Sequence, residues 1–214
     1  MDALLIDPLY LAALFFLVAL AYSAVGLAGG SSYTALLALF GMPHSAIPGI
    51  SLTLNVLVSS ITSFNFIRYG RLRLGLIAPF LVTSIPAAYV GGSLHLEREL
   101  FLWLLLLSLI PVVVRIYWFE SPSLRLDLSP RTALLVSLLA GALLGLVSGI
   151  LGIGGGVYLV PLILVLGLGD AKEAAACGTV FIWINSVSGL VARVLHHAIP
   201  WAELALLAGA VALG

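Results

Sequence analysis

Long unbroken runs of apolar residues recur along the chain, and they constrain its fold more than any other feature. A helix needs roughly 20 apolar residues to cross the hydrocarbon core of a bilayer. The runs that reach or approach this length are Leu9 to Leu27, Ala46 to Ile67, Leu74 to Leu94, Leu100 to Trp118, Thr132 to Leu151 and Ala171 to Leu195. They do not alternate as the strands of a membrane barrel do. The sequence therefore predicts an all-α integral membrane protein, a polytopic helical bundle in the lipid bilayer.

The composition agrees with this prediction and excludes other classes of protein. Hydrophobic residues make up 62% of the 214 residues and charged residues only 8%, which is too few to cover the surface of a water-soluble fold. The formal net charge is zero, and the nine lysines and arginines lie in loops or near the ends of the apolar runs. No basic face is present, so we expect no nucleic-acid partner.

Two further apolar runs, Ser32 to Phe40 and Val157 to Leu166, are only about half the length of a crossing, and each follows a cluster of glycines. Shifting the chain against itself by about 126 positions aligns the two clusters. The matched pairs are Gly26 with Gly152, Gly29 with Gly155, Gly30 with Gly156, Gly41 with Gly167, Thr53 with Thr179 and Ser60 with Ser186. We therefore expect two related repeats, each with a Gly-rich broken or half-length helix.

These features divide the chain into four parts. We expect an N-terminal tail at residues 1–8, a first transmembrane repeat at 9–119, a polar linker at 120–131 and a second transmembrane repeat at 132–214. The last apolar run reaches Gly214 without the charged or aromatic flank that normally ends a spanning helix. We therefore expect the second repeat to be incomplete at the C-terminal end of this sequence.

The arginines predict how the chain is oriented. They gather in two loops, with Arg68, Arg71 and Arg73 in the first and Arg115, Arg125 and Arg131 in the second. By the positive-inside rule, both loops, including the linker, face the cytoplasm. The equivalent loop of the second half contains only Arg193, His196 and His197. This loss of positive charge suits an inverted second repeat, although two parallel repeats remain an alternative.

The glycine clusters at 25–33 and 149–157 are the strongest candidates for a binding site. Each glycine disfavours a helix by about 1 kcal/mol relative to alanine, so we expect the backbone to unwind there and a short new helix to begin. Its free N–H groups and positive dipole end would attract an anion. Close helix packing is the alternative, and we prefer it for Gly141 and Gly145, which have the spacing of a packing motif.

Polar residues inside the spans complete the predicted site. Asparagine in a span is costly without a partner, and Asn55 and Asn185 each follow a half-length run. The candidate substrate-binding residues are Gly29, Gly30, Ser31, Ser32, Thr53, Asn55, Gly154, Gly155, Gly156, Thr179, Asn185 and Ser186. Bonds to neighbouring helices or to their own backbone are the alternative for the polar ones. No charged residue lies near the centre of a run, so recognition would depend on backbone amides and hydroxyl groups.

The second cluster also carries a family resemblance. The stretch Gly145-Leu-Val-Ser-Gly-Ile-Leu-Gly-Ile-Gly-Gly-Gly156, followed by Pro161 and by Ala176-Cys177-Gly178-Thr179, resembles the sulfite exporter TauE/SafE family, also called the toluene sulfonate uptake permease family. The resemblance covers nearly the whole chain. It implies two related halves and transport of sulfite, sulfonates and related anions across bacterial cytoplasmic membranes. In the first half, Ala28-Gly29-Gly30-Ser31-Ser32-Tyr33 replaces the family's Gly-x-Gly-Gly-Gly form, which would alter the pocket and therefore the substrate.

Together these features predict a secondary transporter (permease) for small sulfur-containing or organic anions, and coupling to a proton or sodium is compatible with the sequence. An anion-selective channel and a transporter of another small solute are the alternatives, and a homo-oligomer is compatible with the sequence.

The histidines point to no catalytic centre. His44, His95, His196 and His197 fall in three separate loops without metal-ligand spacing, and no hydrolase or metalloprotease motif occurs. We therefore expect neither an enzyme nor a metal or cofactor. Instead, we assign His95 and His196 to interfacial anchoring and His44 to a gating contact near the first glycine cluster.

Overall fold

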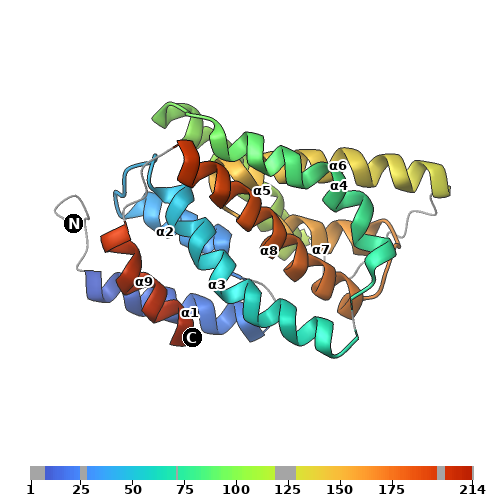
Figure 1. Cartoon of the computed structure of the whole chain (residues 1–214), viewed down its shortest axis with the longest axis horizontal. Helices are drawn as coiled ribbons and strands as arrows, with labels where there is room; N and C mark the ends of the chain where they lie inside the picture. The colour runs from blue at the N-terminus through green and yellow to red at the C-terminus, as the bar shows by residue number, and fades with distance from the viewer. Residues whose placement is uncertain (1–7, 25–27, 71, 119–128, 197–200, 214) are drawn as a thin grey trace.

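The computed structural model describes residues 8–24, 28–70, 72–118, 129–196 and 201–213, and within these ranges all regular secondary structure is helical (Figure 1). The helices are α1 (Pro8–Ala24), α2 (Gly30–Leu39), α3 (Ile47–Arg68), α4 (Leu74–Ser93), α5 (Arg98–Trp118), α6 (Pro130–Leu151), α7 (Gly156–Val165), α8 (Ala171–His196) and α9 (Trp201–Leu213). The predicted all-α fold is confirmed.

Among the described residues, four helices, α3, α4, α6 and α8, are long and apolar enough to cross a membrane. Helix α1 has 17 residues, fewer than the run predicted from Leu9 to Leu27; the end of that run, residues 25–27, lies outside the described residues. Helices α2 and α7 have 10 residues each, about half of what a crossing needs.

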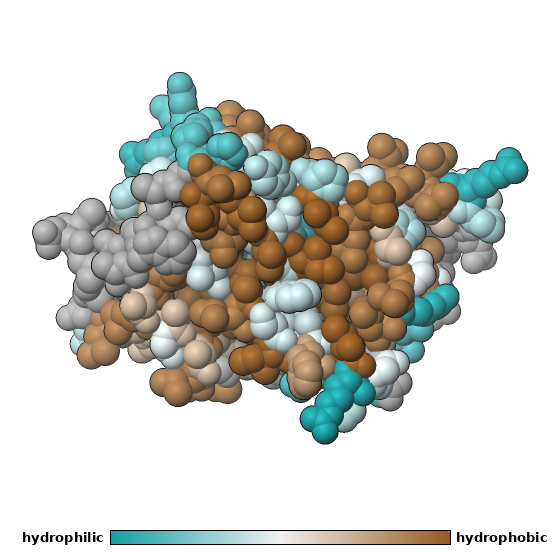
Figure 2. Space-filling view, in the orientation of Figure 1, coloured by the Kyte–Doolittle hydropathy of each residue, from teal (hydrophilic) through white to brown (hydrophobic). Residues whose placement is uncertain are grey.

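The surface of the molecule is apolar along the helices. Leu139 on α6 is 72% exposed, and many other large apolar side chains are likewise uncovered. Figure 2 shows hydrophobic residues over most of the visible face, with strongly hydrophilic residues gathered at its extremities. Exposed apolar surface on this scale indicates contact with lipid rather than water.

Helices α3 and α8 lie side by side and run in opposite directions (Figure 1). Pro48 near the start of α3 lines the same pocket as Arg193 near the end of α8. Further along α3, the side chain of Leu52 approaches Gly189, four residues earlier on α8 than Arg193. This antiparallel pair forms the centre of the bundle and carries most of the buried polar side chains.

Helix α4 packs along α6 through glycines, a contact that we call the α4–α6 seam. A Cβ atom added at Gly141 would collide with the backbone carbonyl of Phe80, and one at Gly145 would collide with that of Ser84. Backbones can approach this closely only where no side chain intervenes. The prediction that Gly141 and Gly145 serve helix packing is therefore confirmed.

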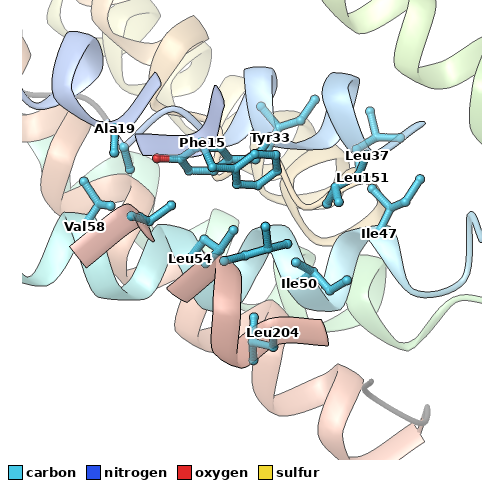
Figure 3. Close-up of a cluster of buried hydrophobic side chains, with 14 of the residues drawn as sticks. Phe15, Ala19, Tyr33, Leu37, Ile47, Ile50, Leu54, Val58, Leu151 and Leu204 are labelled. Atoms are coloured by element: carbon cyan, nitrogen blue, oxygen red, sulfur yellow. The ribbon is translucent and has the colours of Figure 1, made fainter. Parts of the chain in front are cut away.

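An apolar cluster holds the short helix α2 in place. The rings of Phe15 on α1 and Tyr33 on α2 stack with centroids 4.9 Å apart and an interplanar angle of 18°. Figure 3 shows them together with Leu54 of α3 and Leu204 of α9, which belong to the same cluster. Because seven of the described helices contribute buried side chains to this cluster, α2 is anchored although it is too short to span the bilayer by itself.

One end of the bundle is held by an ion pair between distant parts of the chain. Arg73, just before α4, lies 3.3 Å from the carboxylate of Glu173 in the first turn of α8. Glu173 also accepts from the amide of Asp170, whose carboxylate accepts from the amide of Glu173, a reciprocal cap for α8. The start of α8 therefore lies beside the arginine-rich loop that we expect on the cytoplasmic side, and its other end lies opposite.

Candidate functional site

The glycine clusters lie where short helices begin. Helix α6 ends at Leu151 and α7 begins at Gly156. Between them, Gly152, Gly154 and Gly155 have φ angles of 80°, 83° and 78°. In the first half, Gly29 precedes α2 with a φ of 76°. Glycine adopts these left-handed angles without the steric cost that other residues incur, so both clusters require it.

The two clusters contact each other, and we call this contact the glycine crossing. A Cβ atom added at Gly30 would lie 2.5 Å from the carbonyl oxygen of Ile153 and would collide with the amide of Asn55. Added at Gly152, it would lie 2.7 Å from the backbone of Pro48. Residues more than 100 positions apart therefore meet with no room for a methyl group between them.

Two polar side chains flank the crossing. Asn55 on α3 donates from Nδ2 to the carbonyl of Gly152 at 3.0 Å. A Cβ atom at Gly154 would lie 3.0 Å from the same nitrogen and 3.3 Å from the Ser186 hydroxyl on α8. Both residues are buried, and neither Oδ1 of Asn55 nor Oγ of Ser186 has a hydrogen-bond partner in the part of the chain that the structure describes. Buried polar atoms without partners are rare and call for an explanation such as a ligand.

The other predicted polar residues make hydrogen bonds within the protein, although Oδ1 of Asn185, like that of Asn55, has no partner among the described residues. Thr53 donates to the carbonyl of Gly49, Thr179 to that of Ala175, and the amide of Asn185 to that of Phe181, at 2.8, 2.9 and 2.9 Å. Each of these bonds lies within its own helix, as the alternative interpretation proposed.

The remaining predicted residues lie around the crossing. Ser32 donates to the hydroxyl of Tyr22 at 3.0 Å, and Ser31 is buried on α2. A Cβ at Gly155 would press on the ring of Phe181, and one at Gly156 on the side chain of Ile182. Of the candidates, the structure therefore brings Gly30, Asn55, Gly154 and Ser186 together.

Three successive carbonyls at the end of α6 are each held by a side chain from another helix. Ile150 accepts from the guanidinium of Arg193 at 3.1 Å, Leu151 from the hydroxyl of Thr34 at 3.2 Å, and Gly152 from Asn55. The last carbonyls of a helix have no partner within it, and such groups are costly to bury unpaired. The end of α6 is thus satisfied by α8, α2 and α3 together.

Arg193 is a candidate functional residue that sequence reasoning missed. We predicted it in a loop, but it lies in the last turn of α8, and only 5% of it is exposed. That assignment is wrong because α8 turns this side chain inward, toward the end of α6. The signal was present in the sequence, since Arg193 follows Gly189 by four residues and Ser186 by seven, which places all three on one helix face.

Arg193 lines a pocket of about 110 Å³ together with His44, Ser45 and His95. We call it the Arg193 pocket. We had assigned His95 to interfacial anchoring and His44 to a gating contact. Both contribute to this pocket, and the rings of His44 and Phe101 lie 6.3 Å apart. His196 remains exposed beside Tyr89, while His197 lies outside the described residues.

A bundle of lipid-facing helices with buried polar groups at broken helices has the architecture of membrane transport proteins. The chain matches the family described as sulfite exporter TauE/SafE over residues 11–214, and it belongs to that family. It is also 36% identical over 212 residues to a protein of Sinorhizobium fredii (strain NBRC 101917 / NGR234) described as probable membrane transporter protein y4hK, with 95% of this chain and 85% of the relative covered. No solved structure matches the chain. The chain is a membrane transporter, and the resemblance noted in its sequence is confirmed.

Proposed function

We propose that this transporter is a secondary carrier of small sulfur-containing or organic anions, such as sulfite or sulfonates, in a bacterial cytoplasmic membrane. The observation that supports this proposal is the glycine crossing, where the buried hydroxyl of Ser186, which has no partner among the described residues, flanks Gly154 together with the amide nitrogen of Asn55. The family supports the substrate class, since its description names sulfite.

The crossing offers donors rather than charges to an anion. Asn55 uses one N–H of its amide for Gly152 and has a second, and the hydroxyl of Ser186 has a hydrogen to donate. The first amides of α2 and α7 lack partners within their helices and lie at the positive ends of the helix dipoles. Neutral donors hold an oxyanion less tightly than cationic side chains do, which favours its release.

We further propose that the two repeats are inverted. Along α2, Gly30 meets Asn55 and Thr34 bonds to Ser51, so α2 leads from the crossing toward the start of α3. Along α7, Gly156 meets Ile182 and Val160 meets Gly178, so α7 leads toward the start of α8. Because α3 and α8 are antiparallel, these two starts lie at opposite ends of the bundle. Opposite directions for equivalent helices support inverted rather than parallel repeats.

The close packing of the crossing supports a carrier over a channel. An open pore would leave a continuous path through the bundle, whereas the space beside Gly30 is filled by Asn55 and by the backbone of Ile153. An anion can reach this position only if the two halves move relative to each other. The proposed mechanism is therefore alternating exposure of the crossing to the two sides, driven by a proton or sodium gradient.

A binding screen followed by a flux assay tests this function. Purified protein is heated with sulfite, sulfate, thiosulfate, sulfoacetate or simple carboxylates, and a bound anion raises the unfolding temperature. The best binder is then followed into proteoliposomes. A carrier gives saturating uptake that accelerates when the same anion is present on the far side, and uptake that depends on an imposed proton or sodium gradient. Conductance rising linearly with concentration would instead identify an anion channel.

A further inference from the structure

The Arg193 pocket lies at the end of the bundle where α3 begins and α8 ends, opposite the ion pair between Arg73 and Glu173. Among the described residues, its polar lining consists of Arg193, His44, His95 and Ser45, all of which can donate hydrogen bonds, and includes no aspartate or glutamate. The pocket therefore has the polarity of an anion site, and its volume suits an oxyanion of a few heavy atoms better than a bulky one.

The charge on Arg193 is not compensated by the described side chains. Its guanidinium is buried, one terminal nitrogen donates to the carbonyl of Ile150, and Nε has no partner. Among the described residues, no carboxylate lies within ion-pair distance of it. Burying an unpaired charge is costly, and such groups normally pair with an opposite charge.

Capping the end of α6 does not explain why an arginine occupies this position. The next two carbonyls, those of Leu151 and Gly152, are satisfied by the neutral side chains of Thr34 and Asn55. A neutral side chain could satisfy Ile150 in the same way at a lower desolvation cost. The hydrogen bond to Ile150 therefore does not require the positive charge of Arg193.

The pocket and the glycine crossing are built on the same two helices, α3 and α8. Pro48 in the pocket precedes Asn55 by seven residues on α3, and Arg193 follows Ser186 by seven residues on α8. At 1.5 Å per residue, both intervals correspond to about 10 Å along a helix. Both polar residues of the crossing are thus two helical turns below the pocket, on the same two helices.

We propose that the Arg193 pocket is a second anion-binding site, which recruits and selects a small oxyanion at one end of the pathway before passing it to the neutral crossing. The proposal rests on the anion transport proposed above. The two sites then have different roles. Arg193 supplies the positive charge that selects anions, and the crossing supplies weaker, neutral donors that allow the anion to be released.

The test compares Arg193→Gln and Arg193→Lys in the full chain, with sulfite as the probe. Glutamine can still donate to Ile150, so the unfolding temperature without ligand should change little. We expect Arg193→Gln to raise the KM for sulfite transport at least tenfold and to abolish most of the thermal shift caused by sulfite, because a charge-assisted contact is lost. Arg193→Lys, which keeps the charge but not the planar fork, should be intermediate.

Arg98→Gln is the matched control. Arg98 is exposed at the start of α5, at the same end of the bundle, so its loss removes one positive charge without changing the lining of the pocket. Its KM should stay near that of the unchanged protein.

Two results would overturn the proposal in different ways. If Arg193→Gln transports sulfite with an unchanged KM, Arg193 only caps α6, and the pocket is not an anion site. If the unchanged protein neither binds nor transports sulfite or any other anion of the screen, the proposed function fails together with this inference.

Discussion

The glycine crossing and the α4–α6 seam are both rich in glycine, but the glycines have different surroundings in the two regions. In the seam, Gly141 and Gly145 lie inside a regular helix and face the backbone carbonyls of α4. At the crossing, Gly154 has a left-handed backbone and faces the polar side chains of Asn55 and Ser186. The difference teaches that a glycine cluster alone does not identify a site. The left-handed backbone at the crossing, where one helix ends and the next begins, is the feature that the seam lacks.

The largest expected effect comes from filling the crossing. Leucine at Gly30 would overlap the carbonyl of Ile153, and leucine at Gly155 would be strained at a φ of 78° and would press on Phe181. We expect Gly30→Leu and Gly155→Leu to abolish transport into proteoliposomes while the protein still inserts into the membrane, as quantified in membrane fractions. Gly75→Leu is the control, since nothing lies within 4 Å of a Cβ at Gly75. Normal transport by both crossing variants would refute the site.

Substituting the seam should separate stability from transport. In Gly145→Ala, the added methyl group meets the carbonyl of Ser84, and overpacking of this kind costs about 1–3 kcal/mol. We expect a lower unfolding temperature but an unchanged KM for the protein that remains folded. A raised KM with unchanged stability would show that the seam also contributes to binding, which would contradict the proposed difference between the seam and the crossing.

Changing Asn55 should affect both properties. Asn55→Asp keeps the shape but removes the donor to Gly152, which leaves a buried carbonyl unsatisfied at a cost of about 1–3 kcal/mol. The new carboxylate would also repel an anion, so we expect a larger loss of transport than in Asn55→Ala. Asn65→Asp, at an exposed position on the same helix, controls for the added charge. Equal transport by the Asp and Ala variants would contradict an anionic ligand.

The smallest change compares two buried serines. The hydroxyl groups of Ser186 at the crossing and of Ser84 in the seam both lack partners among the residues that the structure describes. Neither Ser186→Ala nor Ser84→Ala should destabilise the fold, because no hydrogen bond within the protein is lost. We expect only Ser186→Ala to raise the KM for the anion, by about fivefold, which corresponds to one hydrogen bond of roughly 1 kcal/mol. Identical kinetics for both variants would exclude Ser186 from the site.

The helices could be predicted closely from the sequence because each apolar run carries its own signal. For example, α8 was expected from Ala171 to Leu195 and is found at Ala171–His196. The helix ends at the glycines were similarly accessible, since glycine lowers helix stability locally. Domain boundaries and repeat orientation involve contacts between distant segments, which an apolar pattern does not encode.

The partners within the candidate site could not be predicted. Whether Asn55 meets Gly152, or Thr179 bonds to its own helix, depends on how each helix is rotated about its axis in the bundle. That rotation is set by packing across the whole core. Arg193 shows both sides of this limit: its spacing from Ser186 places the two residues on one helix face, but only the rotation of α8 in the bundle shows that this face is buried.

Three hydrogen bonds from other helices hold the end of α6 in place. Arg193, Thr34 and Asn55 fasten consecutive carbonyls to three other helices, so α6 cannot shift against them until all three bonds open. At about 1 kcal/mol net for each, the three hydrogen bonds together favour the present arrangement of the helices by roughly 3 kcal/mol, or about a hundredfold in population. A bound anion that draws the guanidinium of Arg193 away from Ile150 would break one of these bonds. Its binding would therefore make it easier for the crossing to become exposed to the other side of the membrane.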